Sequence, residues 1–185
     1  MRIVVVGNSC SGKTTLARAL VKAYGTSHGL RHVELDSLFW DRGWAEATPE
    51  IFSARVKEAL ASDAWVADGN YLKYRQLLWS RADTVIWLDF PLPIILLRFF
   101  RRSLFRSLTR KELWNGNRET FRNNLLGRHS LLAWILTSHA TRRAQLEALV
   151  RAPELAHLRF VRARTPAAAR NAVAALAERR ARECH

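Results

Sequence analysis

The 185-residue chain is poor in cysteine and in long apolar runs. Its two cysteines, Cys10 and Cys184, lie at opposite ends, so neither a disulfide framework nor a structural zinc site is expected. No apolar run approaches the roughly 20 residues that span a bilayer, because the run 91–97 leads directly into arginines. The apolar run 2–6 is followed by no signal-peptide cleavage pattern. We therefore expect a cytoplasmic protein with no membrane partner.

Acidic residues are scarce in the second half of the chain. Residues 1–90 hold 11 Lys and Arg against 10 Asp and Glu, whereas residues 91–185 hold 19 against 6. The net charge of +14 therefore lies almost entirely in the second half. Such an excess favours an anionic partner, namely the phosphates of a substrate, a nucleic acid backbone or an acidic surface. Arginine-rich codon usage is the alternative explanation, and it has equal weight for the last 35 residues.

Internal repeats, low-complexity tracts and linkers are also lacking, which predicts one domain over residues 1–185. Short apolar runs typical of buried strands alternate with helical patterns. The expected strands are 2–6, 31–35, 65–67, 84–88 and 158–161, and the expected helices are 12–24, 50–62, 92–151 with a break near 114–117, and 166–182. This alternation predicts an α/β fold, in which a five-stranded parallel sheet is covered by helices on both faces.

The first expected strand ends at a phosphate-binding motif. The segment Gly7-Asn8-Ser9-Cys10-Ser11-Gly12-Lys13-Thr14 matches G-x-x-x-x-G-K-[ST] in full, between a strand and a helix. In such a loop, backbone N–H groups and the helix N-terminus bind phosphates, the lysine reaches the β- and γ-phosphates, and the hydroxyl binds magnesium. The cofactors expected are ATP and Mg²⁺, since no Asn-Lys-x-Asp guanine motif is present. We assign the nucleotide site to Gly7, Asn8, Ser9, Cys10, Ser11, Gly12, Lys13, Thr14 and Thr15.

Two aspartates follow expected strands, at the sheet edge where ligands bind in doubly wound folds. Asp36 follows the second strand, and we expect it to orient or deprotonate a hydroxyl acceptor. The alternative role for Asp36 is to cap a short helix over 37–40. Asp68 ends the third strand, and we expect it to hold magnesium together with Thr14. Capping the following helix is the alternative for Asp68.

An arginine row follows the fourth strand. Four arginines at helical spacing are predicted to face outward, while an apolar stripe on the other face of the same helix is buried. The arginines are Arg98, Arg101, Arg102 and Arg106. The apolar stripe is Leu97, Phe100, Leu104 and Leu108. Further basic residues follow at Arg110, Lys111, Arg118 and Arg122. We interpret residues 98–128 as an arginine-rich helical lid, in which Arg98 and Arg102 stabilise the transferred phosphoryl group. A solvated basic face is the alternative.

The segment between the second and third strands is aromatic. Phe39, Trp40, Trp44 and Phe52 are available to stack on a ring-shaped acceptor or to pack in the core. We favour the core for Phe52 and the acceptor for Trp40. Together with Asp36 and Trp40, we assign Asn70 and Arg75 to acceptor binding.

Several blocks together resemble adenylate-kinase-related P-loop NTPases of the DNA topology modulation protein group. These blocks are Gly7–Thr14, 35–40 with Trp44, 65–71, 88–91 and the lid-like segment 110–119. The resemblance implies a nucleoside- or nucleotide-kinase-like fold with sheet order 2-3-1-4-5 and a lid over the ATP site. One departure concerns specificity. Adenylate kinases place Gly-Phe-Pro-Arg after the third strand's aspartate, whereas here Asp68-Gly69 is followed by Asn70-Tyr71, so an AMP kinase is not favoured.

The sequence thus predicts an ATP-dependent phosphotransferase with an unidentified small acceptor, which is a nucleoside, a nucleotide or another hydroxyl compound. A monomer or a homodimer is expected. The alternative is an ATP-dependent regulator bound to nucleic acid, with weak hydrolysis only. Because the basic half shows no DNA-binding module, the kinase is favoured. A third interpretation is a P-loop protein that binds ATP and hydrolyses it slowly.

Overall fold

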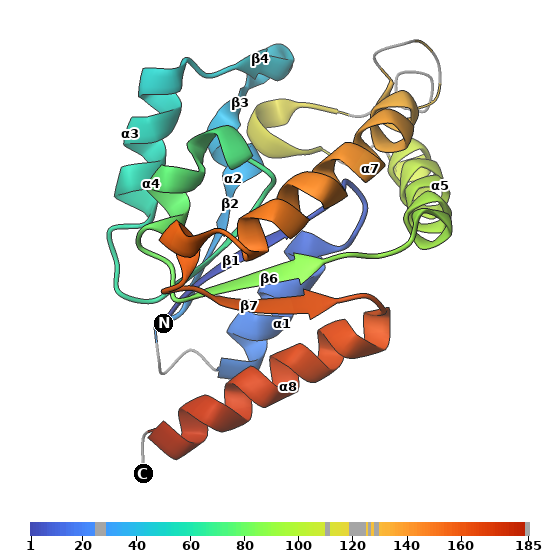
Figure 1. The fold of residues 1–185 in the computed structure, drawn as a ribbon. Helices are drawn as coiled ribbons and strands as arrows, with labels where there is room; N and C mark the ends of the chain where they lie inside the picture. Colours follow the sequence, from blue (N-terminus) through green and yellow to red (C-terminus); the bar gives the residue numbers. More distant parts are fainter. Residues whose placement is uncertain (25–28, 110–111, 119–124, 126, 128–129, 184–185) are drawn as a thin grey trace.

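The computed structural model describes residues 1–24, 29–109, 112–118, 125, 127 and 130–183 (Figure 1). Its regular elements alternate between strands and helices. In chain order they are β1 (Arg2–Gly7), α1 (Lys13–Tyr24), β2 (Arg31–Glu34), α2 (Leu35–Phe39), β3 (Trp40–Asp41), η2 (Arg42–Trp44), β4 (Ala45–Glu46), α3 (Pro49–Ala59), β5 (Trp65–Asp68), η3 (Leu72–Tyr74), α4 (Arg75–Trp79), β6 (Thr84–Leu88), α5 (Leu92–Thr109), η4 (Trp114–Gly116), α7 (Leu131–Val150), η5 (Pro153–Leu155), β7 (Arg159–Ala163) and α8 (Pro166–Glu183), where η denotes a short 3-10 helix. None of the described helices is long and apolar enough to cross a bilayer.

The main sheet has five strands in the order β2-β5-β1-β6-β7, and every neighbouring pair is parallel. This confirms the parallel five-stranded sheet predicted from the sequence. The strand numbers differ from the predicted order 2-3-1-4-5, because the chain also forms the short antiparallel pair β3-β4 between the second and third strands of the sheet. These two-residue strands are too short to show a periodicity in the sequence.

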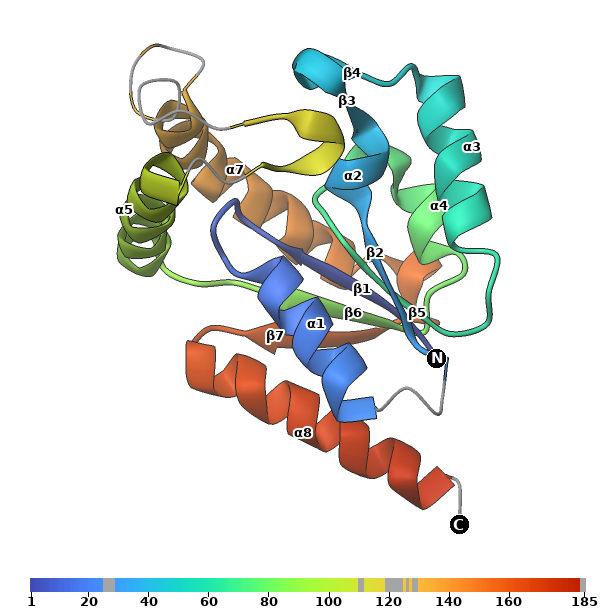
Figure 2. The ribbon, with the colours of Figure 1, turned by 180° about the vertical axis from the view of Figure 1, so that it is seen from behind.

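Helices cover both faces of the sheet. In Figure 2, α1 and α8 lie on the near face, and Figure 1 shows α7 crossing the opposite face. Successive residues of β1 point to opposite sides, so Ile3 and Val5 join the core under α1 and α8, whereas Val4 and Val6 join the core under α3 and α4. Burial of β1 on both faces explains its unbroken apolar sequence. Because β1 is the central strand, the loop after Gly7 lies at the middle of the edge formed by the carboxyl ends of the strands.

Helix ends follow local signals. α3 begins at Pro49, and the Thr48 hydroxyl accepts a hydrogen bond from the Ile51 N–H at 3.3 Å, so the predicted cap is confirmed. The interruption predicted near 114–117 is the η4 turn, at which Asn115 has φ 55°. Pro166 begins α8, as expected.

The helix α7 is joined to the sheet by a charge network at the ends of β6 and β7. Asp89, which is buried, accepts from Arg162 Nε at 2.9 Å and Nη2 at 2.6 Å. Arg162 also donates to Glu147 of α7 at 2.7 Å and lies 4.1 Å above the Trp87 ring. Arg143 of α7 pairs with both carboxylates at 3.6 Å. This network fixes α7 above the carboxyl ends of the strands.

Replacing Asp89 is expected to destabilise the fold. Asp89→Asn removes the buried carboxylate that Arg162 shares with Arg143 and leaves Glu147 as the remaining carboxylate of Arg162, and breaking such a buried pair costs about 3 kcal/mol. Urea unfolding measures the change in the free energy of unfolding. The matched control is Asp83→Asn, because Asp83 is 46% exposed and pairs with Arg2, for which a loss below about 1 kcal/mol is expected. Equal losses in the two variants would contradict the role given to the network.

Candidate active site

The loop between β1 and α1 has the backbone that a phosphate cradle requires. Gly7 has φ 148°, and a Cβ there would lie 2.7 Å from the Leu88 carbonyl oxygen. Gly12 has φ 92°, and a Cβ there would lie 3.0 Å from Arg98 Nη1. Both positions therefore need glycine. Cys10, between them, is also left-handed with φ 63°. The loop leads directly into α1 at Lys13, so the helix N-terminus faces the cradle.

The Lys13 ammonium is folded over this loop. Its Nζ donates to the Gly7 and Asn8 carbonyl oxygens at 3.1 and 3.2 Å. Burial lowers the pKa of Lys13, and the Asp36 and Asp68 carboxylates oppose that shift. The ammonium is therefore held at the loop by hydrogen bonds to neutral carbonyl oxygens. A bound phosphate would offer it anionic oxygens, to which hydrogen bonds are stronger.

Asn70, predicted to bind the acceptor, contacts the phosphate loop in this structure. Its Oδ1 accepts from the Gly7 N–H at 3.0 Å, and its Nδ2 donates to the Gly7 carbonyl. The turn after β5 is thereby tied to the first residue of the loop. Asn70 also borders the cavity described below, so its acceptor role stays a prediction beside this structural one.

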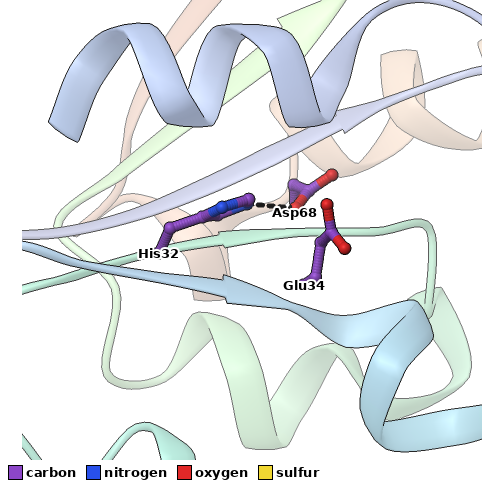
Figure 3. Close-up of side chains that lie close together, drawn as sticks. All are labelled: His32, Glu34 and Asp68. Atoms are coloured by element: carbon purple, nitrogen blue, oxygen red, sulfur yellow. Dashed lines mark hydrogen bonds and ion pairs between the residues drawn. The ribbon is translucent and has the colours of Figure 1, made fainter. Parts of the chain in front are cut away.

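Thr14 and Asp68, the predicted magnesium ligands, lie together. The Thr14 hydroxyl donates to Asp68 Oδ2 at 2.7 Å, and His32 Nε2 lies 2.7 Å from Asp68 Oδ1 (Figure 3). Asp68 is buried and its carboxylate caps no helix, so the capping alternative is wrong. A hydroxyl and a carboxylate are the hard oxygen donors that Mg²⁺ prefers, so these residues fit the ion.

Glu34 lies close to the same pair, and its ligand atoms and those of His32 and Asp68 are all within 4.8 Å of one another. Its two carboxylate oxygens accept from Arg18 Nη2 at 3.1 Å and from Trp114 Nε1 at 2.6 Å. Because both oxygens are bound by the protein, Glu34 serves first to join β2 to α1 and to η4.

Asp36 lies inside α2 and does not cap it. Glu34 occupies the N-cap position, so the predicted capping role of Asp36 is wrong. Its Oδ1 instead accepts from the Tyr71 hydroxyl at 2.7 Å. Burial raises the pKa of Asp36, while Lys13 and the Tyr71 hydrogen bond oppose the rise. A buried carboxylate beside the phosphate loop, with a pKa that burial raises, is a candidate to accept a proton from a bound hydroxyl.

Removing the Tyr71 hydroxyl is expected to change the pH profile of phosphoryl transfer. Tyr71→Phe deletes a donor that lowers the pKa of Asp36, so that pKa rises further. A base must be ionised to act, so the acid limb of the kcat profile moves to higher pH. We expect kcat to fall about tenfold, since a hydrogen bond to a charged group contributes roughly 1.5 kcal/mol. Tyr74→Phe is the control, because the Tyr74 ring packs on Phe52 in the same cavity. An unmoved acid limb in Tyr71→Phe would remove the hydroxyl from this role.

The apolar stripe predicted for α5 is wrong. Leu97, Phe100, Leu104 and Leu108 are exposed by 71%, 46%, 54% and 76%, whereas Ile95, Phe99 and Ser103 are buried. Each of the arginines at 98, 102 and 106 follows one of these buried residues by three positions and lies on the cavity side of the helix. Apolar residues occur on two faces of α5, so periodicity alone selected the wrong one. Within this row of four arginines, Arg101 alone is exposed and does not border the cavity.

Arg98 and Arg102, the predicted catalytic arginines, both line the cavity. Arg98 Nη1 donates to the Ser11 carbonyl, and its guanidinium lies 4.8 Å above the Phe90 ring. Burial lowers the pKa of Arg98. Arg118 forms an exposed ion pair with Glu112 at 3.6 Å. Arg110, Lys111 and Arg122 of the predicted lid lie outside the described residues.

Residues 112–118, which we call the clasp, contact the aromatic segment after α2. Asn117 donates from Nδ2 to the Asp41 carbonyl and accepts at Oδ1 from the Trp44 N–H, both at 2.9 Å. Asn115 Nδ2 donates to the Trp40 carbonyl at 2.6 Å. Both views of the ribbon show the clasp beside α2 and β3 (Figures 1 and 2). This part of the predicted lid therefore contacts the aromatic segment to which the sequence assigned the acceptor.

One cavity of about 2050 Å³ joins these groups. Its walls include the phosphate loop up to Thr15, Asp36, Asp68 and the arginine face of α5. Trp40 borders it and meets the rings of Phe39 and Trp44 edge-on, at 5.0 and 5.7 Å between centroids. Phe52 is fully buried, as expected. Arg75 is exposed on α4 and does not border the cavity.

The fold also brings to this site several residues that are not among the candidates predicted from the sequence. They are His32, Tyr71, Trp114, Asn117 and Arg142. His32 and Glu34 alternate along β2 beside Asp68, so the strand pairing contained a signal for His32. Tyr71 and Trp114 contact partners 35 and 80 residues away, which no local pattern marks.

Neither a family model nor a curated protein sequence matches the chain. Solved structures do match in fold. A gluconokinase from Sinorhizobium meliloti 1021 aligns over 100% of this chain and 97% of its own, with 19% identity and a TM-score of 0.50. A shikimate kinase from Acinetobacter baumannii, in complex with shikimate, aligns over 95% and 89%, with 18% identity and a TM-score of 0.52. At this identity the likenesses show a P-loop kinase fold, and the DNA topology modulation group stays a prediction.

Proposed function

We propose that the chain is an ATP-dependent phosphotransferase that moves the γ-phosphoryl group to a hydroxyl of a small acceptor. The observation that carries this proposal is the joining of a phosphate loop and a buried carboxylate in one cavity. Lys13 and Asp36 both border it, and their charges interact. A protein that only bound or hydrolysed ATP would not need an acceptor-side carboxylate with a raised pKa.

The roles follow from position. Loop N–H groups and Lys13 bind the phosphates of ATP, while Thr14 and Asp68 hold magnesium. Bound Mg²⁺ supplies charge neutralisation at the β- and γ-phosphates. The acceptor hydroxyl lies at Asp36, which takes its proton as the acceptor oxygen bonds to the γ-phosphorus. The bond from that phosphorus to the β–γ bridging oxygen breaks, and ADP leaves. Arg98 and Arg102 stabilise the negative charge of the transferred group.

The acceptor side is a wall formed by Trp40, Trp44 and Tyr71 around Asp36. Aromatic rings at this wall favour an acceptor with a flat or apolar face, since such rings gain most from stacking or apolar contact. The two solved structures of similar fold are a gluconokinase and a shikimate kinase that holds shikimate. We therefore place small hydroxyl compounds ahead of nucleotides as the acceptor.

A panel of acceptors tests the proposal. Purified protein with Mg²⁺ and ATP is assayed for ADP formation with nucleosides, nucleotides, sugars, sugar acids and cyclic hydroxy acids. The expected result is a rise in ADP formation with one chemical class, together with a phosphorylated product detected by mass spectrometry. ADP formation that no acceptor stimulates would reject the kinase and leave slow hydrolysis as the activity.

A further inference from the structure

The helix α7 presents one polar face to the cavity. The residues on this face are Trp134, Thr137, Ser138, Thr141, Arg142 and Gln145, at the spacing of a single helical stripe. The helix is held rigidly, because Ile135 and Leu146 are buried and Arg143 and Glu147 pair with groups of the sheet. The backbone that carries this face is therefore held in place relative to the sheet.

Arg142 is the cation of that face. Its guanidinium lies 5.0 Å above the Trp134 ring and is half-buried. Among the residues that the structure describes, no carboxylate oxygen forms an ion pair with it within 4.0 Å, whereas its neighbour Arg143 pairs with both Asp89 and Glu147. A desolvated cation without a carboxylate partner is costly, and an anion bound beside it would offset that cost.

The charges around Arg142 show which position in the cavity it serves. Its field acts on Lys13, at the phosphate loop, and the Asp36 carboxylate acts on Arg142 in turn. Burial lowers the pKa of the guanidinium and Asp36 opposes that shift. Arg142, Lys13 and Asp36 also border one and the same cavity. The group that lies between such a cation and such a base during transfer is the γ-phosphoryl group.

We propose that Arg142 is a catalytic residue that binds the γ-phosphoryl oxygens as this group passes from ATP to the acceptor hydroxyl. The inference rests on the proposed transfer reaction and adds a residue to it. An arginine fork suits this role because its planar donors bind two oxygens at once, and a cation fixed in advance stabilises the spreading charge. The Trp134 ring packs against the guanidinium, so part of the conformational freedom of this side chain is already lost before the phosphoryl group binds.

Nucleotide binding tests this assignment without any acceptor. Calorimetry with Mg²⁺ compares ADP, the β,γ-imido analogue of ATP, and ADP with aluminium fluoride, which imitates the transferring group. For Arg142→Gln we expect an unchanged Kd for ADP, about a tenfold weaker Kd for the imido analogue, and about a hundredfold loss for the fluoride complex. Arg142→Lys keeps the charge and loses the fork. Its Kd values for the imido analogue and the fluoride complex are expected to lie between those of Arg142→Gln and those of the wild-type protein. Arg151→Gln, at the exposed C-cap of α7 and outside the cavity lining, is the control and is expected to change none of the three.

Two results would overturn the assignment. Equal weakening of all three ligands by Arg142→Gln would show a general structural effect. Unchanged binding of all three would show that Arg142 does not touch the γ-phosphate, and a raised acceptor KM in the same variant would assign it to an anionic group of the acceptor. The test is separate from the proposed transfer: if no acceptor is phosphorylated but only the γ-dependent affinities fall, the contact stands and the transfer reaction fails.

Discussion

Asp36→Asn is expected to lower phosphoryl transfer by about 100- to 10,000-fold, the contribution typical of a positioned general base. The amide cannot accept the acceptor's proton, yet it keeps the size of the side chain and an oxygen that can accept from Tyr71. ATP affinity is expected to stay within about twofold, because the phosphates are bound by the loop and Lys13. Steady-state assays with the acceptor found in the panel, together with calorimetric titration of ATP, measure the two quantities separately.

A second aspartate nearby provides the control for this experiment. Asp41 on β3 is 41% exposed and pairs with Arg55 at 3.0 Å, outside the cavity lining. Asp41→Asn therefore makes the same chemical change in the same segment, and transfer is expected to stay within about threefold, as for an exposed ion pair. Full activity in Asp36→Asn would remove the base from the mechanism and leave the carboxylate a structural partner of Tyr71.

Lys13→Met is expected to weaken ATP binding by about 100-fold, which corresponds to roughly 2.7 kcal/mol for charged hydrogen bonds to phosphate. Transfer falls further, because the same cation stabilises the charge that develops on the γ-phosphoryl group. The fold is retained, since the variant also removes a buried ammonium whose pKa desolvation lowers. ATP titration and thermal unfolding measure both effects.

The control for Lys13 lies on the same helix. Lys22, in the last turn of α1, is exposed, and Lys22→Met makes the same replacement away from the loop. ATP affinity in this control is expected to stay within about twofold, since exposed charges at such a distance are screened. If Lys13→Met bound ATP as tightly as Lys22→Met does, the loop would not be the triphosphate site.

Features encoded by a few adjacent residues could be predicted from the sequence. The Thr48-Pro49 start of α3, the glycines at 7 and 12 and the β1–loop–α1 order depend on neighbours within one turn, and the structure shows each of them. Strand order also followed from the resemblance, apart from the two short strands of the β3-β4 pair. The helix start, the two glycines and the strand–loop–helix order are therefore determined almost entirely by neighbouring residues.

Features that depend on distant partners could not be predicted in this way. The buried face of α5 was misassigned because Leu97 and Ile95 are equally apolar, and only the position of the helix on the sheet distinguishes them. Asp36 was recognised as a candidate base, but its partner Tyr71 lies 35 residues away. Arg142 is one arginine among many in a basic half, and only the cavity sets it apart.

The clasp has an experimental consequence of a different kind. The Trp114 indole donates to Glu34, its ring meets that of Trp44 at 6.3 Å, and Trp44 in turn meets Trp40. Three of the chain's seven tryptophans thus lie across the junction between the clasp and the aromatic segment after α2. Separation of the two surfaces would wet these indoles and break a hydrogen bond to a carboxylate. The wavelength of tryptophan emission would therefore report any separation of the clasp from the aromatic segment after α2, without an attached dye.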